Sequence, residues 1–239
     1  MGGHRPTPPE SILSAAAPRP PALELVIFDC DGVLVDSEPI SNAVLAQALT
    51  REGLPTSAAS ALDEFRGLHM RDVVARSEER LGRALPAGWI ESYEQARADA
   101  FRRSLVATPG AAEAVRAVIA AGPAVCVASQ GRPEKTELTL SLTGLRELFG
   151  TDAVFSAYSV ARGKPQPDLF LHAAAAMGAR AERCAVIEDT TVGVTAAVAA
   201  GMRVLGYAAA GGADALAAAG AEVITALAEI PARLGLTKG

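Results

Sequence analysis

Short apolar runs alternate with helical patterns over most of the chain. Runs of this kind, bounded by turn residues, are typical of strands buried on both faces of a parallel sheet. The six runs predicted as strands are 25–28, 124–128, 153–156, 184–187, 203–207 and 222–225. The helices predicted between them are 109–121, 133–142, 167–177, 192–200 and 213–219. Such a regular alternation predicts an α/β fold: a doubly wound, Rossmann-like parallel sheet with right-handed crossovers.

The segment between the first two predicted strands has no strand pattern. Ile40, Val44 and Leu45 recur at helical spacing, and Gly53 and Pro55 end that helix. Further helical stretches are 62–65, 73–81 and 89–101. We therefore predict an all-helical cap domain at residues 39–105, inserted into a core domain made of residues 23–38 and 106–239.

Residues 1–22 differ from the rest of the chain, because they are rich in proline and alanine and show little periodicity. This composition predicts a disordered leader. A signal peptide with 11–17 as its apolar region is the competing interpretation. That region is short, contains serines and is followed by several prolines, so we prefer the disordered leader.

Composition narrows the class of partner. The 239 residues carry a formal charge of −5 with both signs interspersed, and only 4% of them are aromatic. Neither feature suggests a nucleic-acid surface or a platform for stacking bases. No apolar run approaches the roughly 18 residues that a membrane-spanning helix needs. We expect a small-molecule partner, no nucleic acid, no membrane, a cytoplasmic location, and a monomer or weak homodimer.

The three cysteines, Cys30, Cys126 and Cys184, lie in or beside strand-like runs. Their odd number and the lack of metal-ligand spacing are typical of small buried residues in a reduced, intracellular protein. Cys30 stands between two acids, but a nucleophilic role would need a positioned base, and no histidine is near it in the sequence. We therefore interpret Cys30 as a packing residue.

Two carboxylates, Asp29 and Asp31, follow the first predicted strand with one residue between them. Ligands of open α/β sheets bind outside the carboxyl ends of the strands, and Gly32 lets the backbone turn tightly there. Acids this close repel each other unless a cation or a shared proton intervenes. A Mg²⁺ ion suits them, since it prefers carboxylates, carbonyls, water and phosphate oxygens. The alternative is an ordinary turn made of Asp and Gly.

Further polar residues stand at other predicted strand ends and before helices. Ser129 ends the second strand, Glu188 and Asp189 end the fourth, and Lys164 lies in a loop before a helix. Each has an ordinary structural interpretation: a helix cap, partners of a helix dipole, and a solvated charge, respectively. Because all of them converge on the sheet edge that carries Asp29, the sequence favours a single site there.

Four stretches, 29–38, 127–129, 163–168 and 186–193, resemble the haloacid dehalogenase superfamily in residues and in order. The resemblance is to the β-phosphoglucomutase-like group, which carries a helical cap after the first strand. The middle of the chain, 123–131 and 170–177, is more similar to bacterial 6-phosphogluconate phosphatase-like proteins. The resemblance implies an enzyme, a phosphoric monoester hydrolase that uses Mg²⁺.

The resemblance also implies a role for each motif residue. Asp29 would be the nucleophile and Asp31 the general acid and base, with Ser129 binding phosphate and Lys164 neutralising charge. Glu188 would be either a direct metal ligand or a partner of one. The implied metal ligands are Asp29, Asp31 through its backbone carbonyl, Glu188 and Asp189. The implied substrate-binding residues are Gln130 in the core and Arg66, Gly67, His69 and Arg71 in the cap.

The implied reaction is hydrolysis of a small phosphorylated metabolite, a sugar phosphate or sugar-acid phosphate, through an aspartyl phosphate on Asp29. Mg²⁺ and Lys164 would remove the repulsion between the Asp29 carboxylate and the phosphate. Asp31 would protonate the leaving alcohol and then deprotonate the attacking water. The dehalogenases of the superfamily lack this second acid, so Asp31 points to phosphoryl transfer.

Substrate choice is expected to depend on the cap loop 65–71, where arginines and a histidine surround a glycine. Arginines there suit an anionic or polyhydroxylated sugar phosphate, although an ordinary loop with surface arginines is an equal alternative. A β-phosphoglucomutase is the second candidate function, but that group usually carries a histidine where this chain has Ser41. A non-catalytic regulatory module on the same fold is the third candidate, which the presence of Asp29, Asp31, Lys164 and Asp189 disfavours.

Overall fold

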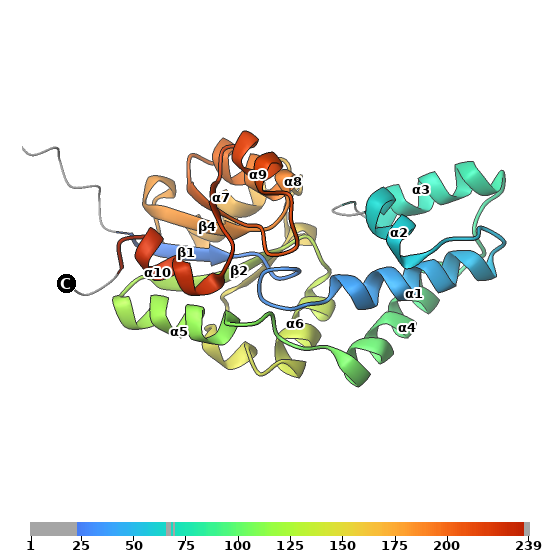
Figure 1. Ribbon diagram of the computed structural model, residues 1–239, viewed down its shortest axis with the longest axis horizontal. Coiled ribbons are helices and arrows are strands. Elements are labelled where there is room, and N and C mark those ends of the chain that lie inside the picture. Colours follow the sequence, from blue (N-terminus) through green and yellow to red (C-terminus); the bar gives the residue numbers. More distant parts are fainter. Residues whose placement is uncertain (1–22, 66–67, 69, 237–239) are drawn as a thin grey trace, which may run out of the picture.

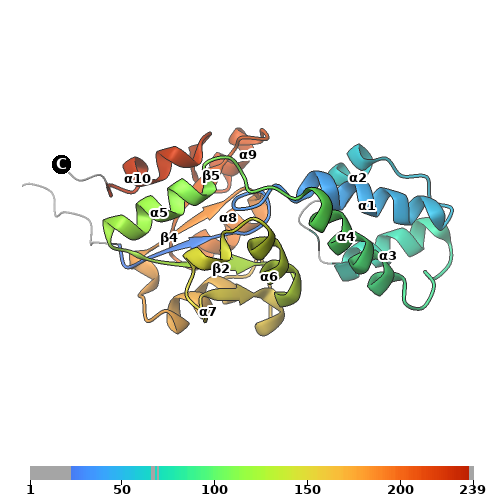
Figure 2. The same cartoon turned by 90° about the horizontal axis from the view of Figure 1, so that it is seen from below.

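The computed structural model describes residues 23–65, 68 and 70–236. It consists of a sheet flanked by helices and, at one end, a separate group of helices (Figure 1, Figure 2). The predicted leader, residues 1–22, and the cap-loop residues Arg66, Gly67 and His69 lie outside the described residues. No helix of the described part is long and apolar enough to cross a membrane.

Six parallel strands form one sheet in the order β3-β2-β1-β4-β5-β6. The strands are β1 (Leu25–Phe28), β2 (Ala124–Ser129), β3 (Val154–Ser156), β4 (Cys184–Glu188), β5 (Arg203–Tyr207) and β6 (Glu222–Ile224). The chain moves outward from β1 to β3 and then returns to the other side of β1, so the winding direction reverses between β1 and β4. Such a switch point leaves a crevice at the carboxyl ends of its two strands. The predicted α/β fold with a doubly wound sheet is confirmed.

Helices cover both faces of the sheet, as two-sided burial of β1 requires: its four residues are at most 1% exposed. Helices α5, α6 and α10 lie on one face, and α7, α8 and α9 lie on the other (Figure 1, Figure 2). These are α5 (Ala111–Ala121), α6 (Pro133–Leu142), α7 (Asp168–Ala176), α8 (Thr191–Ala199), α9 (Ala213–Ala218) and α10 (Ile230–Arg233). The apolar runs of the sequence therefore form a core between two helical layers.

Four further helices, which we call the helical cap, follow β1. They are α1 (Glu38–Arg51), α2 (Ala58–Phe65), α3 (Met70–Leu81) and α4 (Trp89–Ser104). The cap has its own hydrophobic cluster, in which Leu49 is fully buried and the rings of Trp89 and Tyr93 stack with centroids 5.8 Å apart. Full burial of such a side chain stabilises the packed state by about 1.5–3 kcal/mol. The division into domains at 39–105 stays a prediction.

Two chain segments connect the helical cap to the sheet, and they run side by side. The backbone N–H of Asp36 donates to the carbonyl of Val106 at 3.1 Å, and that of Thr108 donates to Leu34 at 3.0 Å. Val35 and Ala107 form an antiparallel bridge between these bonds. This short ladder fixes where the cap leaves and rejoins the sheet, next to the crevice at the end of β1.

Candidate active site

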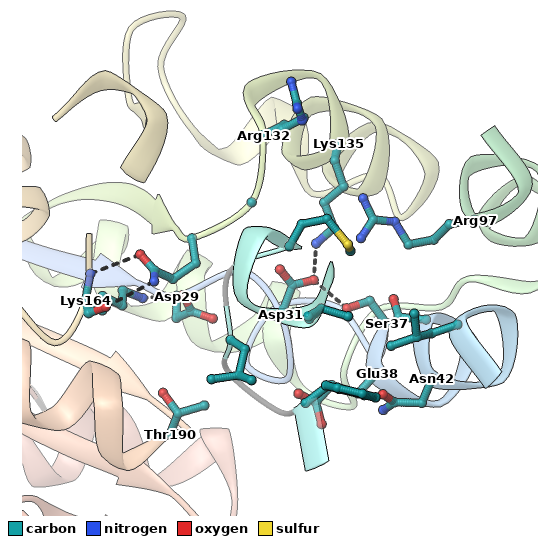
Figure 3. Close-up of a pocket in the computed structure, with 18 of the residues that line it drawn as sticks. Asp29, Asp31, Ser37, Glu38, Asn42, Arg97, Arg132, Lys135, Lys164 and Thr190 are labelled. Atoms are coloured by element: carbon teal, nitrogen blue, oxygen red, sulfur yellow. Dashed lines mark hydrogen bonds and ion pairs between the residues drawn. The ribbon is translucent and has the colours of Figure 1, made fainter. Parts of the chain in front are cut away.

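The residues predicted from strand ends meet at the switch point. Asp29 directly follows β1, and its backbone N–H donates to the carbonyl of Ile187 in β4 at 3.0 Å. Glu188 is the last residue of β4, so its side chain emerges beside that of Asp29. Both line a cavity of about 210 Å³ between the sheet and the helical cap (Figure 3).

Lys164 is buried between these two acids. Its Nζ lies 2.5 Å from Oδ1 of Asp29 and 2.5 Å from Oε1 of Glu188, and it also donates to the carbonyl of Ala128 at 3.1 Å (Figure 3). The side chains of Lys164 and Glu188 are only 2% and 1% exposed. A buried ion pair persists only when hydrogen bonds satisfy its members, as they do here. The interpretation of Lys164 as a solvated loop charge is therefore wrong.

Gln130 holds the loop that carries Lys164. Its side-chain oxygen accepts from the backbone N–H of Lys164 at 3.0 Å, and its side-chain nitrogen donates to the carbonyl of Lys164 at 3.3 Å. The side-chain amide of Gln130 thus bonds to the backbone of Lys164 as a neighbouring strand would, and it fixes the position of the Lys164 backbone. Gln130 also lines the cavity, where it can reach a bound substrate. The substrate-binding role of Gln130 stays a prediction.

Glu188 uses both carboxylate oxygens within the protein. Oε1 accepts from Lys164, while Oε2 accepts from the backbone N–H groups of Asp189 and Thr190 at 3.0 Å each and from the Thr190 hydroxyl at 2.9 Å. Gly193, in the first turn of α8, leaves the space for this carboxylate, because a Cβ there would lie 1.8 Å from Oε1. Of the two roles predicted for Glu188, these contacts favour the indirect one, in which it positions Lys164 and the Asp189 loop.

Asp31 lies on the side of the cavity nearer to the helical cap. Its Oδ1 accepts hydrogen bonds from the hydroxyl of Ser37 and from the ammonium group of Lys135 (Figure 3). Lys135 comes from the first turn of α6, and its side chain is 10% exposed. The sequence reasoning missed both partners.

The charged side chains in the cavity shift one another's pKa values. Burial raises the pKa of Asp29 to about 7; Lys164 partly offsets this, whereas the nearby Glu188 and Asp31 charges raise the pKa further. Burial alone would lower the pKa of Lys164, but the two carboxylates outweigh it and raise that pKa. Burial would raise the pKa of Asp31, but the charge of Lys135 and its hydrogen bonds hold it below its usual value. The cavity can therefore accept a further positive charge beside Asp29.

The donor atoms around Asp29 fit Mg²⁺. Within the described ranges, no three His, Cys, Asp or Glu side chains are grouped as a metal site on their own. Mg²⁺ needs no such group, because it keeps several waters and binds through one or two carboxylates and substrate phosphate. Asp29 and Asp189 line the same cavity. Gly32, with φ of +82°, lets the backbone pass so close that a Cβ there would lie 2.3 Å from Oδ2 of Asp189.

Ser129, at the end of β2, is fully buried. Its hydroxyl accepts from the backbone N–H of Gly131 at 3.0 Å, and the carbonyl of Gly131 accepts from Ser156 at 2.7 Å. These bonds hold the loop between β2 and α6 in a tight turn. Gln130, Gly131 and Arg132 of this loop line the cavity. The phosphate-binding role of Ser129 stays a prediction.

Of the predicted substrate-binding residues in the cap, only Arg71 lies within the described part of the chain, and the structure places it away from the cavity. Arg71, predicted to bind substrate, has a side chain that is 84% exposed and pairs with its neighbour Asp72 at 3.2 Å. It is not among the residues that line the cavity, whereas the nearby Leu68 and Met70 are. The structure thus does not bring Arg71 together with Asp29. Besides Lys164, the described cations that line the cavity are Arg97 of α4, and Arg132 and Lys135 at the start of α6.

The comparisons with known proteins agree with this geometry. The model of the haloacid dehalogenase-like hydrolase family matches residues 23–201. The chain is 31% identical over 183 residues to the 6-phosphogluconate phosphatase of Escherichia coli, covering 76% of this chain and 81% of that protein.

Two solved structures extend the match to three dimensions. A haloacid dehalogenase family hydrolase from Deinococcus radiodurans, with bound phosphate and sodium, is 34% identical with a TM-score of 0.75, covering 92% of this chain and 99% of that one. A conserved haloacid dehalogenase-like protein from Agrobacterium tumefaciens is 32% identical with a TM-score of 0.75, covering 90% and 98%. The predicted resemblance and the prediction of a phosphatase enzyme are confirmed. The chain belongs to the haloacid dehalogenase-like hydrolases.

Proposed function

We propose that the protein is a Mg²⁺-dependent phosphatase that hydrolyses a small phosphate monoester, a sugar phosphate or sugar-acid phosphate, through an aspartyl phosphate on Asp29. The observation that carries this proposal is the buried Lys164, held between Asp29 and Glu188 at the switch point of the sheet. A buried ammonium group beside a nucleophilic carboxylate is what an incoming phosphate dianion requires, because it reduces the repulsion between two negative groups.

Asp29 and Asp31 divide the chemistry. One oxygen of Asp29 attacks phosphorus, the bond from phosphorus to the alcohol oxygen breaks, and Asp31 donates its proton to that oxygen. Water then attacks phosphorus, Asp31 takes a proton from it, and the bond to Asp29 breaks to release phosphate. Lys135 and Ser37 favour the carboxylate form of Asp31, which the second step uses. The first step needs the protonated acid, and therefore a shift of Lys135 away from it.

The remaining core residues position these groups. Mg²⁺, held by Asp29, Asp189 and the carbonyl of Asp31, would supply charge stabilisation to the phosphoryl oxygens. Lys164 would bind one of those oxygens, with Glu188 and Gln130 fixing its direction. The N–H groups that follow Ser129, at the start of α6, would donate to the others. The Deinococcus radiodurans relative, which holds phosphate and sodium, supports an anion site and a cation site on this fold.

The cavity supports a small substrate. Its volume of about 210 Å³ is below the 300–1,000 Å³ typical of drug-sized ligands. The name of the Escherichia coli relative supports a phosphorylated sugar acid among the candidates. Ser41 lines the cavity at the position where the β-phosphoglucomutase resemblance implies a histidine, which supports hydrolysis over mutase chemistry. A cytoplasmic location and a monomeric or weakly dimeric state stay predictions.

A phosphate-release screen tests the proposal. Sugar phosphates, sugar-acid phosphates, nucleotides and phosphonates are incubated with the protein, with and without Mg²⁺. We expect release from sugar or sugar-acid phosphates in the presence of Mg²⁺, and a phosphoryl group on the peptide containing Asp29 after rapid acid quenching. Release from none of the substrates would refute the phosphatase proposal. Release without the phosphorylated peptide would refute the covalent mechanism.

A further inference from the structure

A second group of cations lies on the far side of Asp31 from Lys164. Lys135 reaches it from α6 and Arg97 from α4, and both head groups point into the space beside the Asp31 carboxylate (Figure 3). The contact between Lys135 and Asp31 is an ion pair, and Arg97 is close enough to act on the charge of Asp31. Core and helical cap thus each contribute one cation to the same part of the cavity.

Arg97 is held in place by aromatic rings. Its guanidinium carbon lies 5.1 Å from the centroid of Tyr93 and 6.0 Å from that of Phe101, and Nζ of Lys135 lies 5.9 Å from the same Phe101 ring. Such cation–ring contacts orient a guanidinium group without neutralising it. Among the ion pairs between described residues, none involves Arg97, whereas the neighbouring Arg132 pairs with Glu94 at 3.0 Å.

The proposed reaction fixes which part of the substrate meets these cations. The alcohol oxygen must lie within hydrogen-bond reach of Asp31, because Asp31 protonates it. The phosphoryl group lies on the other side, at Asp29 and Lys164. The rest of the alcohol therefore extends into the space bounded by Lys135 and Arg97. Lysine has three donors and arginine five. Lys135 makes one hydrogen bond to the described residues, to Asp31, so donors remain for a ligand.

We propose that Arg97 and Lys135 form a subsite for an anionic group on the alcohol part of the substrate, a carboxylate or a second phosphate. This inference rests on the proposed function and makes it narrower: the protein selects phosphate esters whose alcohol carries its own negative charge. The planar fork of Arg97 suits the two oxygens of a carboxylate, and the cap helix that carries it places the anion opposite the transferred phosphate. The other acids facing this space are Glu94, which Arg132 occupies, and Glu38 of α1.

The test compares substrates that differ in one group. The three are 6-phosphogluconate, glucitol 6-phosphate and glucitol 1,6-bisphosphate, which carry a carboxylate, a hydroxymethyl group and a second phosphate at the same end of a six-carbon chain. The readout is the ratio of kcat/KM for each anionic substrate to that for glucitol 6-phosphate. We expect a ratio of about 10 to 100 for at least one anionic substrate, the range for a charge-assisted hydrogen bond. The substrate that gives the larger ratio identifies the anion.

Three variants separate recognition from folding. R97M keeps the apolar stem over Tyr93 and Phe101 but removes the charge, so we expect it to bring the ratio close to one. R97K keeps the charge and should retain part of the ratio. R102Q is the matched control, because Arg102 lies on the same helix, is 52% exposed and pairs only with Asp99 among the described residues; we expect it to leave the ratio unchanged. Thermal unfolding checks that each variant is folded.

The outcomes distinguish this inference from the function on which it rests. A wild-type ratio near one for both anionic substrates, or a ratio that R97M leaves unchanged, would overturn the anion subsite and leave the phosphatase intact. Hydrolysis of none of the three, in a protein that releases phosphate from no sugar phosphate, would overturn the proposed function and the subsite with it.

Discussion

Replacing Gly193 by alanine tests whether the Glu188 carboxylate is held as rigidly as its contacts indicate. In most helices this change stabilises the protein by about 0.5–1 kcal/mol, because glycine loses more backbone freedom on folding. Here the added Cβ would lie 1.8 Å from Oε1 and 2.0 Å from Cδ of Glu188. The carboxylate is 1% exposed and accepts four hydrogen bonds, so it has little room to move away. We expect Gly193→Ala to destabilise the protein.

The magnitude follows from what must give way. Inserting a methyl group into a packed interior costs about 1–3 kcal/mol when neighbours have to shift. A shift of Glu188 also disturbs Lys164, whose bond to Oε1 is charge-assisted and worth about 1.5–3 kcal/mol. Because Lys164 contacts Asp29 as well, kcat should fall together with stability. We expect urea unfolding to show a lower free energy of unfolding. We also expect kcat to fall without a compensating fall in KM.

A double-mutant cycle isolates the contact. Glu188→Ala removes the group that a Cβ at 193 would meet, and it leaves Lys164 balanced by Asp29. In that background Gly193→Ala should show its ordinary helix effect, a gain of about 0.5–1 kcal/mol. The coupling between the two changes is then about 1.5–4 kcal/mol. Gly150→Ala is the control, since a Cβ there would make an ordinary contact at 3.8 Å with Ala153. An equal effect of Gly193→Ala in both backgrounds would refute the reasoning.

Three further predictions concern the nucleophile, the metal and the thiols. Asp29→Asn should abolish phosphate release while thermal unfolding stays cooperative, because the amide has the size of the carboxylate but is a poor nucleophile; wild-type release by this variant would exclude Asp29 as nucleophile. Exhaustive chelation should remove activity, and added Mg²⁺ should restore it; full activity in the chelator would exclude the metal site. Burial raises the pKa of Cys184 to about 11, and it raises those of Cys30 and Cys126 as well. Iodoacetamide at about pH 8 should therefore label none of the three until the protein is unfolded, and rapid labelling of native Cys30 would contradict its interpretation as a packing residue.

The strands, and the polar residues at which they end, could be predicted because both are local properties of the sequence. A buried parallel strand is a continuous apolar run, and its last residue is at the ligand edge in any such sheet. Asp29 and Glu188 were therefore found by their position alone. Lys164 was placed at the same edge because its loop directly precedes a helix, and the family resemblance then gave it a role. Its burial could not be predicted, since nothing local distinguishes a loop lysine that is buried from one that is solvated.

Residues whose contacts depend on how distant segments pack could not be predicted from the sequence. The bond between Lys135 and Asp31 joins residues 104 positions apart, and no motif marks it. A signal existed in the first turn of α6, which directly follows the β2 loop and so faces the same edge as Asp29. No sequence signal marked Arg97, because its position in the cavity depends on how α4 packs against α6. Arg71 was chosen instead from a loop motif, although charge at a glycine turn is as common on an open surface as in a site.

The ion pair between Glu94 of the helical cap and Arg132 of the core lies at the edge of the cavity that both bodies share. Both side chains are partly exposed, 28% and 47%, and Arg132 also lies 5.1 Å from the ring of Tyr158. An exposed pair of this kind contributes about 0–1 kcal/mol, too little to hold two bodies together. Among the described residues, the apolar clusters of the cap and of the sheet are separate, so this part of the chain has no shared core that would oppose movement between them. If the substrate contacts Arg97 from the cap and Lys164 from the core as proposed, we expect these contacts to contribute more than the ion pair to bringing the two bodies together. A substrate lacking either anionic end should then close the cavity less completely.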